Sequence, residues 1–216
     1  MRKNRRIPTR VLVAVGVCVA GAAFGFGLAV SSGAEGGGKP LGREGFGVFD
    51  TGPSAAIEPE LVSLGEDVGV DAKDKSQFRV LGTGLGQWNS RLVAFPARGG
   101  QNVCYSLLAA KPTDPGMSRC YQPRGDNLPA ELAGKRFSVV APQALIDGVK
   151  STQVFGVAEN NVKSVRVMVA GSWRDAQMLK NGFFLDLPGV PTSDVSTVEA
   201  TLANGSTQAY VIRSAE

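Results

Sequence analysis

One uninterrupted apolar stretch near the N-terminus constrains this chain more than any other feature. Residues 11–30 carry no charged side chain and no strongly polar one. At 1.5 Å per residue, a helix of about twenty residues spans about 30 Å, the thickness of the hydrocarbon core of a bilayer. A helix on the surface of a soluble domain would present a polar face, and this stretch has none. The stretch therefore predicts a transmembrane helix that contacts membrane lipid from Val11 to Val30.

Basic residues precede the apolar stretch without any acid among them, at Arg2, Lys3, Arg5, Arg6 and Arg10. The next charge along the chain is Glu35. Because Lys and Arg are retained on the cytoplasmic side of a membrane, this distribution predicts a cytoplasmic N-terminus and a C-terminal domain outside. Residues 1–10 would then be a cytoplasmic basic arm.

A cleaved signal peptide is the alternative to an anchor. Ser32, Gly33 and Ala34 are small residues that suit cleavage near Ala34, which would release a secreted protein. The apolar stretch is longer than the roughly 7–15 residues of a usual signal peptide, and this favours the uncleaved single-pass anchor.

Gly21 and Gly25 are spaced so that two membrane helices could approach closely. This spacing makes a helix–helix dimer a candidate interaction. In a stretch that contains four glycines, however, the spacing also arises readily by chance.

The positive net charge does not indicate nucleic-acid binding. The chain has a formal charge of +4, but five of its 23 basic residues lie in the first ten positions. The remaining 18 basic residues are matched by 19 acidic ones, and no basic cluster interleaved with aromatic residues follows. The charge is therefore a topology signal, and we expect no nucleic-acid partner.

The chain contains no histidine. This absence excludes Ser-His-Asp and Cys-His catalysis and every histidine metal site. Carboxylate or lysine chemistry remains conceivable, and its candidates are Asp114, Asp126, Asp175, Asp186 and Lys180. No spacing singles out a pair among them, so the sequence predicts neither a catalytic site nor a metal or cofactor.

Two cysteines lie beyond the apolar stretch, at Cys104 and Cys120. An even pair in an exported domain predicts a disulfide. Closing a loop of about 17 residues would stabilise the fold by roughly 3 kcal/mol. Because Pro112 and the turn at residues 114–116 fold the intervening chain back, the bridge should join a strand to the segment after its turn.

Residues 31–56 are rich in glycine and proline and predict a flexible spacer. Phe46, Val48 and Phe49 are the exception, since apolar residues in a spacer need a surface on which to dock. Short helices are predicted at 54–64 and 127–133, each after a residue suited to cap it. The glycines at positions 82, 84 and 86 resemble a phosphate loop, but a strand follows them, so we expect a turn.

The remaining sequence is typical of antiparallel β-structure. Short apolar strands alternate with turn signals, and Asn181-Gly182 and Asn204-Gly205 are strong hairpin signals. This spacing predicts an all-β sandwich, immunoglobulin-like over residues 150–214. Strands are expected at 91–96, 103–109, 136–140, 154–157, 165–169, 176–179, 183–187, 197–202 and 209–212. We therefore distinguish a disulfide-containing β-rich region at 57–149 from a sandwich-like region at 150–216. No linker composition separates the two regions, so they form either two domains or one continuous domain.

The same pattern predicts part of the core. Val165, Val167 and Val169 should share one face of a strand, with Phe183 or Phe184 nearby.

Two sets of residues together resemble a known group of proteins. The first set leads from Gly86 and Trp88 through residues 92–96 and Gly99-Gly100 to Cys104 and Cys120. The second comprises residues 154–157, 162–167 and 181–184. Over residues 78–212 the chain resembles a loose group of uncharacterised, membrane-anchored or secreted β-rich proteins of high-GC Gram-positive bacteria. The resemblance implies an envelope location and no particular activity.

Three functions are compatible with these features. The first is a tethered extracytoplasmic interaction or sensing module with a protein or envelope partner. The second is a transmembrane regulator of a membrane complex, which would act through a partner helix because a ten-residue arm is too short to fold. The third is an envelope enzyme that uses carboxylate chemistry. The absence of a catalytic constellation favours the first.

Overall fold

A computed structural model describes residues 45–50, 78–97, 102–108, 117–122, 134–146 and 149–212. The predicted transmembrane helix at 11–30, most of the spacer and the two predicted helices at 54–64 and 127–133 lie outside these ranges. Within them, no helix is long and apolar enough to cross a bilayer. The helices described there are two short 3₁₀ turns, η1 (Gly47–Phe49) and η3 (Thr192–Asp194).

The described residues form three antiparallel sheets, so the prediction of a mainly β fold is confirmed. Sheet A has the order β1 (Arg79–Leu85), β2 (Ser90–Ala97), β3 (Asn102–Leu108), β4 (Met117–Tyr121). Sheet B has the order β10 (Gln177–Leu179), β11 (Gly182–Pro188), β7 (Val149–Ala158), β5 (Phe137–Val140), and β6 (Gln143–Ile146) also pairs with β7. Sheet C has the order β13 (Thr207–Val211), β12 (Val195–Leu202), β8 (Val162–Val169), β9 (Ser172–Asp175).

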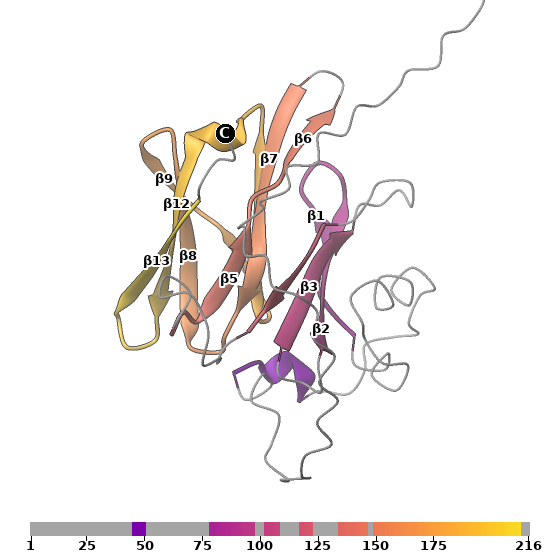
Figure 1. Cartoon of the computed structure of the whole chain (residues 1–216), viewed down its shortest axis with the longest axis vertical. Helices are drawn as coiled ribbons and strands as arrows, with labels where there is room; N and C mark the ends of the chain where they lie inside the picture. The colour runs from indigo at the N-terminus through magenta and orange to yellow at the C-terminus, as the bar shows by residue number, and fades with distance from the viewer. Residues whose placement is uncertain are drawn as a thin grey trace, which may run out of the picture.

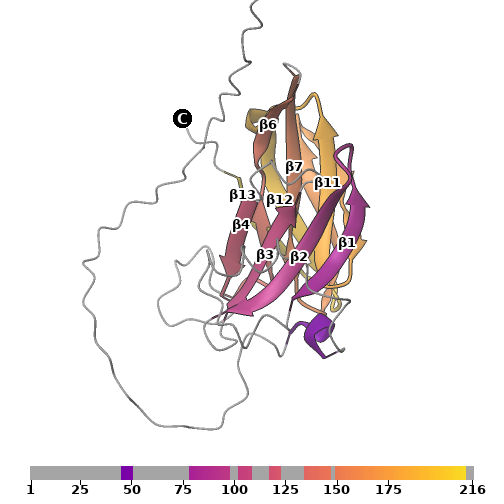
Figure 2. The same ribbon diagram turned by 90° about the vertical axis from the view of Figure 1, so that its right-hand side faces the viewer.

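Sheet B is the middle layer, with sheet A on one side and sheet C on the other (Figures 1 and 2). Alternate residues of a strand point to opposite faces, and the central strands of sheet B are apolar on both. Phe155 and Phe184 pack in the cluster shared with sheet A. Val154 and Phe183 pack in the cluster shared with sheet C. The layers are therefore joined through two apolar cores.

The predicted core of the C-terminal region is confirmed. Val165, Val167 and Val169 are all buried, and they belong to the same cluster as Phe183. Phe184 directs its side chain to the other face of sheet B, toward sheet A. Of the two phenylalanines considered, Phe183 is thus the one that packs with the valines.

Sheets B and C share a corner. Only Ala176 separates β9, which pairs with β8 in sheet C, from β10, which pairs with β11 in sheet B. The amide of Ala176 donates a hydrogen bond of 2.9 Å to the carbonyl of Val165, which fixes the bend. One stretch of chain therefore changes sheets and closes this side of the core.

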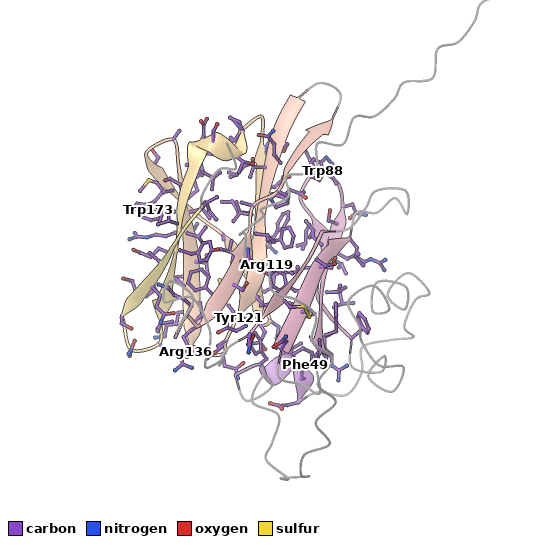
Figure 3. The ribbon with its side chains drawn as sticks, in the orientation of Figure 1. Phe49, Trp88, Arg119, Tyr121, Arg136 and Trp173 are labelled. Carbon is purple, nitrogen blue, oxygen red and sulfur yellow. A yellow bond between two sulfur atoms is a disulfide. The ribbon has the colours of Figure 1, made fainter. Side chains whose placement is uncertain are left out.

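Arg119 of β4 ties the three layers together along another edge (Figure 3). Its guanidinium donates to the carbonyl of Val139 in sheet B at 3.2 Å and to the hydroxyl of Tyr210 in sheet C at 3.5 Å. A planar guanidinium with several donors suits this bridging position.

The hairpins predicted from Asn-Gly are confirmed. Asn181 has a φ of 59° in the turn between β10 and β11, and Gly205 has a φ of 83° in the turn between β12 and β13. The predicted glycine turn lies later than expected. Strand β1 continues to Leu85, with irregular register against β2, and the turn comprises residues 86–89. Buried Leu81 and Leu85 hold the intervening residues in the sheet.

The disulfide between Cys104 and Cys120 is present and joins directly opposed residues of β3 and β4. Cys104 is fully buried on the face of sheet A that also carries Val93 and Phe95. The bridge thus joins a strand to the segment after its turn, as expected, and it covalently fixes the edge strand of sheet A.

We expect replacement of both cysteines by serine to lower the free energy of unfolding by roughly 3 kcal/mol, because the unfolded chain gains the freedom of an open loop. Thermal unfolding of the wild type and the double variant measures this loss. Thiol titration of the native protein is the check on the bond itself. Two reactive thiols at Cys104 and Cys120 would contradict the bridge.

Residues 45–50 dock at one end of the layers, and we call this segment the plug. Phe46, Val48 and Phe49 are buried to 1%, 4% and 8% exposure in the core between sheets A and B. Burying such side chains stabilises by roughly 1.5–3 kcal/mol each. These three residues of the predicted spacer therefore belong to the folded domain.

Candidate functional site

The carboxylate and lysine candidates do not come together in the described residues. Asp175 is exposed on β9, and Lys180 lies in the turn between β10 and β11. Asp186 lies six residues beyond Lys180 along β11, a separation of roughly 20 Å in an extended strand. Asp114 and Asp126 lie outside the described ranges. The three candidates that the structure describes, Asp175, Lys180 and Asp186, therefore do not form a pair with one another.

Asp186 has a structural partner instead. Its Oδ2 accepts a hydrogen bond of 2.8 Å from the backbone amide of Gln87, in the turn between β1 and β2. Gly86 permits this approach, since a Cβ there would lie 2.6 Å from the same oxygen, and its φ of +61° also favours glycine. The glycine and the aspartate therefore hold the turn against sheet B.

Buried polar atoms without a protein hydrogen-bond partner occur near this turn. They include Asp186 Oδ1 and Gln153 Nε2, which belong to directly opposed residues of β11 and β7. Ser90 Oγ, at the start of β2 just after the turn, is a third. Ordered water usually satisfies such groups in folded proteins. The ion pairs among the described residues are Arg136–Glu159 and Arg166–Glu199, and neither includes any of these three atoms.

Burial changes the ionisation of the Tyr105 side chain. Complete burial between sheets A and B raises the pKa of its phenol well above the usual value. The hydrogen bond to Ser138, 2.9 Å long, and the charge of Arg119 oppose this effect without cancelling it. The phenol is therefore a neutral core group and not a nucleophile.

This shift predicts a loss of stability at alkaline pH. An unfolded tyrosine ionises near pH 10, whereas folded Tyr105 stays protonated. The stabilisation by the neutral phenol is therefore fully present below about pH 10. Above that pH, the free energy of unfolding should fall by up to about 1.4 kcal/mol per pH unit as the pH rises toward the raised pKa. Urea unfolding of the wild type and of Tyr105→Phe between pH 9 and pH 11 measures the difference. Equal slopes for both proteins would contradict the assignment.

A depression near the plug is too small for a typical ligand. It lies between the turn after β7 and the turn before β11, and its volume is about 180 Å³. Ligand pockets are usually about 300–1,000 Å³. Its polar lining includes Glu159, Asn160, Lys180 and Asn181. Glu159 already forms an ion pair of 3.0 Å with Arg136, so the depression does not offer a free carboxylate.

The outer face of sheet C is the most distinctive exposed surface. One row of outward side chains crosses its four strands in the order Val211, Thr197, Met168, Trp173, each directly opposite the next. Val211 is 64% exposed and Trp173 is 39% exposed. They are two of the three large apolar side chains that are exposed in the described ranges. Figure 3 shows Trp173 at the outer side of this sheet, away from sheet B.

The neighbouring row is charged. It runs from Ala209 through Glu199 and Arg166 to Asp175. Arg166 forms an ion pair of 2.6 Å with Glu199, and its guanidinium lies 4.3 Å from the ring centre of Trp173. A cation over an aromatic ring holds that ring in place. The face therefore combines an aromatic ring under a guanidinium, an apolar row and a row with two carboxylates and one guanidinium.

Sequence reasoning did not find this surface. The alternation along residues 165–169 indicates that Arg166 and Met168 face away from the valines. However, the alignment of Val211 with Trp173 depends on the order and register of four strands. No sequence motif indicates that register.

No protein-family model, curated protein or solved structure matches this chain. The resemblance to envelope proteins of high-GC Gram-positive bacteria therefore stays a prediction.

Proposed function

We propose that the protein is a non-catalytic interaction or sensing module that is tethered to the outer side of a cell membrane and binds its partner through the outer face of sheet C. The observation that carries this proposal is the row from Val211 to Trp173. Its side chains remain partly or fully exposed although the opposite face of the same sheet is a packed core. Aromatic side chains ringed by polar groups are typical anchors of protein interfaces.

The tether is the second part of the proposal. It consists of the anchor at residues 11–30 with Arg2, Lys3, Arg5, Arg6 and Arg10 on its cytoplasmic side. The Cys104–Cys120 bridge supports an oxidising, extracytoplasmic location. We also propose that the strands of residues 150–214 have an immunoglobulin-like arrangement.

A photoreactive residue placed at position 211 tests the binding face in intact cells. We expect a cross-linked product there and none from position 80, since Val80 is the third exposed large apolar residue but lies in sheet A. Trp173→Ala should reduce the yield from position 211 by roughly tenfold, as loss of an interface anchor does. Equal yields from positions 80 and 211, or an unchanged yield in Trp173→Ala, would refute the assignment of this face.

Topology requires a separate experiment. A reporter that is active only in the cytoplasm, fused after Glu216, should be inactive. N-terminal sequencing of the mature protein should begin at or near Met1, whereas a start near Glu35 would mean a secreted protein.

The regulator alternative predicts that exchanging residues 11–30 for an unrelated anchor abolishes function, whereas an interaction module tolerates the exchange.

A further inference from the structure

Sheet C has one covered edge and one open edge. At the β13 edge, Lys135 Nζ donates a hydrogen bond of 2.8 Å to the carbonyl of Ala209. The side chain of Gln208 bonds to the backbone of Gly134 and Arg136 on the same side. The segment that leads into β5 therefore covers this edge. At the other edge, β9 pairs only with β8, and all four of its residues are exposed.

The register of β8 and β9 decides where the backbone groups of β9 point. The two strands are joined by a two-residue turn at positions 170–171, with positive φ at both residues. In such a hairpin, the pair next to the turn and every second pair beyond it exchange backbone hydrogen bonds. The backbone groups of Ser172 and Arg174 therefore point toward β8. Those of Trp173 and Asp175 point away from it, to the open edge.

Two N–H groups and two carbonyls are thus available at the open edge of β9. The hydrogen bond from the amide of Ala176 to Val165 in β8 continues the same alternation, which supports the assignment. Among the described residues, no hydrogen bond outside the β8–β9 pairing reaches the backbone of Trp173 or Asp175. The pairing of β8 with β9 has no register shift, and β9 contains no proline. An edge of this kind is a template for one more strand.

Three side chains of β9 determine the chemistry of a strand that fits. Trp173 and Asp175 point to the outer face of sheet C, and Arg174 points to the opposite face. The guanidinium of Arg166 lies 4.3 Å from the ring centre of Trp173. The ion pairs found in the described ranges include neither Arg174 nor Asp175. An apolar residue opposite Trp173, an acid opposite Arg174 and a base opposite Asp175 would complement this edge. In an antiparallel strand these residues follow one another as basic, acidic and apolar.

A second copy of β9 does not fit this edge. A two-fold axis at Arg174 would place two guanidinium groups directly opposite each other, and an axis at Asp175 would do the same with two carboxylates. Like charges in that position destabilise a strand pair. An axis at Trp173 would place Gly171, a turn residue with a φ of 80°, opposite Asp175. The edge therefore favours a segment of different sequence.

We propose that the partner contributes an extended segment that pairs antiparallel with β9 as a fifth strand of sheet C and carries a basic, an acidic and an apolar residue in succession. The apolar residue lies opposite Trp173 and extends the row that begins at Val211. Backbone hydrogen bonds provide the attachment, and the side chains determine the register. This inference rests on the proposed function, because it names the chemistry of the partner that sheet C binds.

Selection from short random peptides displayed on phage tests the added strand, with the full chain in lipid nanodiscs as the target. We expect the enriched peptides to share the basic–acidic–apolar triplet. Asp175→Pro removes an N–H that points away from β8, so β9 stays paired while an added strand loses a hydrogen bond. The enrichment should then fall roughly tenfold. Enriched peptides without the triplet, or equal enrichment on the wild type and on Asp175→Pro, would overturn the proposal.

Asp175→Lys tests the register without a change in the backbone. It reverses one exposed charge, so the enriched peptides should carry an acid in place of the base, two positions before the apolar residue. Thr207→Pro is the control on the covered edge. Because Thr207 lies two positions before Ala209, whose carbonyl points outward to Lys135, its N–H also points away from the sheet. An unchanged triplet with Asp175→Lys, or a loss of enrichment with Thr207→Pro equal to that with Asp175→Pro, would refute the added strand.

The added strand and the proposed binding face fail independently. A cross-link from position 211 without a selected triplet would refute the added strand and leave the face standing. A selected triplet that Asp175→Pro abolishes, without a cross-link from position 211, would refute the proposed face and leave the strand site at β9 standing.

Discussion

Replacing Gly156 by alanine should be the most damaging single substitution in the described part of the chain. Gly156 lies in the middle of β7, opposite Val139 of β5 on one side and Phe183 of β11 on the other. A Cβ at this position would overlap the carbonyl oxygen of Ser138 and lie 2.7 Å from the ring of Phe183. Because a backbone oxygen of a paired strand cannot move aside, sheet B would have to open. We expect a loss of more than about 4 kcal/mol, measured by urea unfolding or as failure to fold.

Gly189→Ala is the matched control for this substitution. Gly189 directly follows β11 of the same sheet, but no atom lies within 4 Å of the position that an alanine methyl group would take there. Its φ of +76° gives alanine a backbone cost of about 1–2 kcal/mol. If Gly156→Ala costs no more than Gly189→Ala, the tight pairing of β5 and β7 around residue 156 is incorrect.

Phe183→Ala should have the second largest effect, a loss of about 3–5 kcal/mol, because it leaves a cavity in a packed core. Phe183 is completely buried between sheets B and C and meets the Phe137 ring edge-on, with 6.3 Å between ring centres. The contact joins β11 to β5 across β7. Denaturant unfolding of the variant, at a pH well below 10, measures the loss.

Val211→Ala is the control, because it shortens an apolar side chain that lies outside the core. Val211 is 64% exposed on the outer face of sheet C, so its substitution should change stability by no more than about 0.5 kcal/mol. A small effect at both positions would mean that residue 183 does not lie in the core. A large effect at Val211 would mean that the outer face of sheet C is covered in the monomer.

The features that sequence reasoning found are those that local chemistry decides. Asn181-Gly182 forms a hairpin because asparagine and glycine tolerate positive φ. The valines at 165, 167 and 169 lie on one face because side chains alternate along a strand. The disulfide follows from two cysteines placed on either side of a turn. Each of these predictions needed only neighbouring residues.

The features that sequence reasoning missed depend on partners far along the chain. The glycines at 82 and 84 were expected in a turn, but packing of Leu81 and Leu85 against other strands keeps them in β1. Asp186 was considered for catalysis, and its actual contact is the backbone of Gln87. The exposed row on the outer face of sheet C depends on a register across β13, β12, β8 and β9. Local sequence patterns do not determine the order of the strands in three layers. These contacts could therefore not be predicted from local sequence patterns.

The plug also fixes when the protein can finish folding. Its hydrogen bonds to Asn160 and Asn181 span 113 and 133 positions of the chain. At synthesis rates of about 5–20 residues per second, the ribosome needs roughly 7–26 s after Asp50 to produce Asn181. Until then Phe46, Val48 and Phe49 have no groove to enter and stay exposed to solvent or to chaperones. The plug can therefore dock only after the turn between β10 and β11 has been made, so this end of the core is among the last parts of the domain to close.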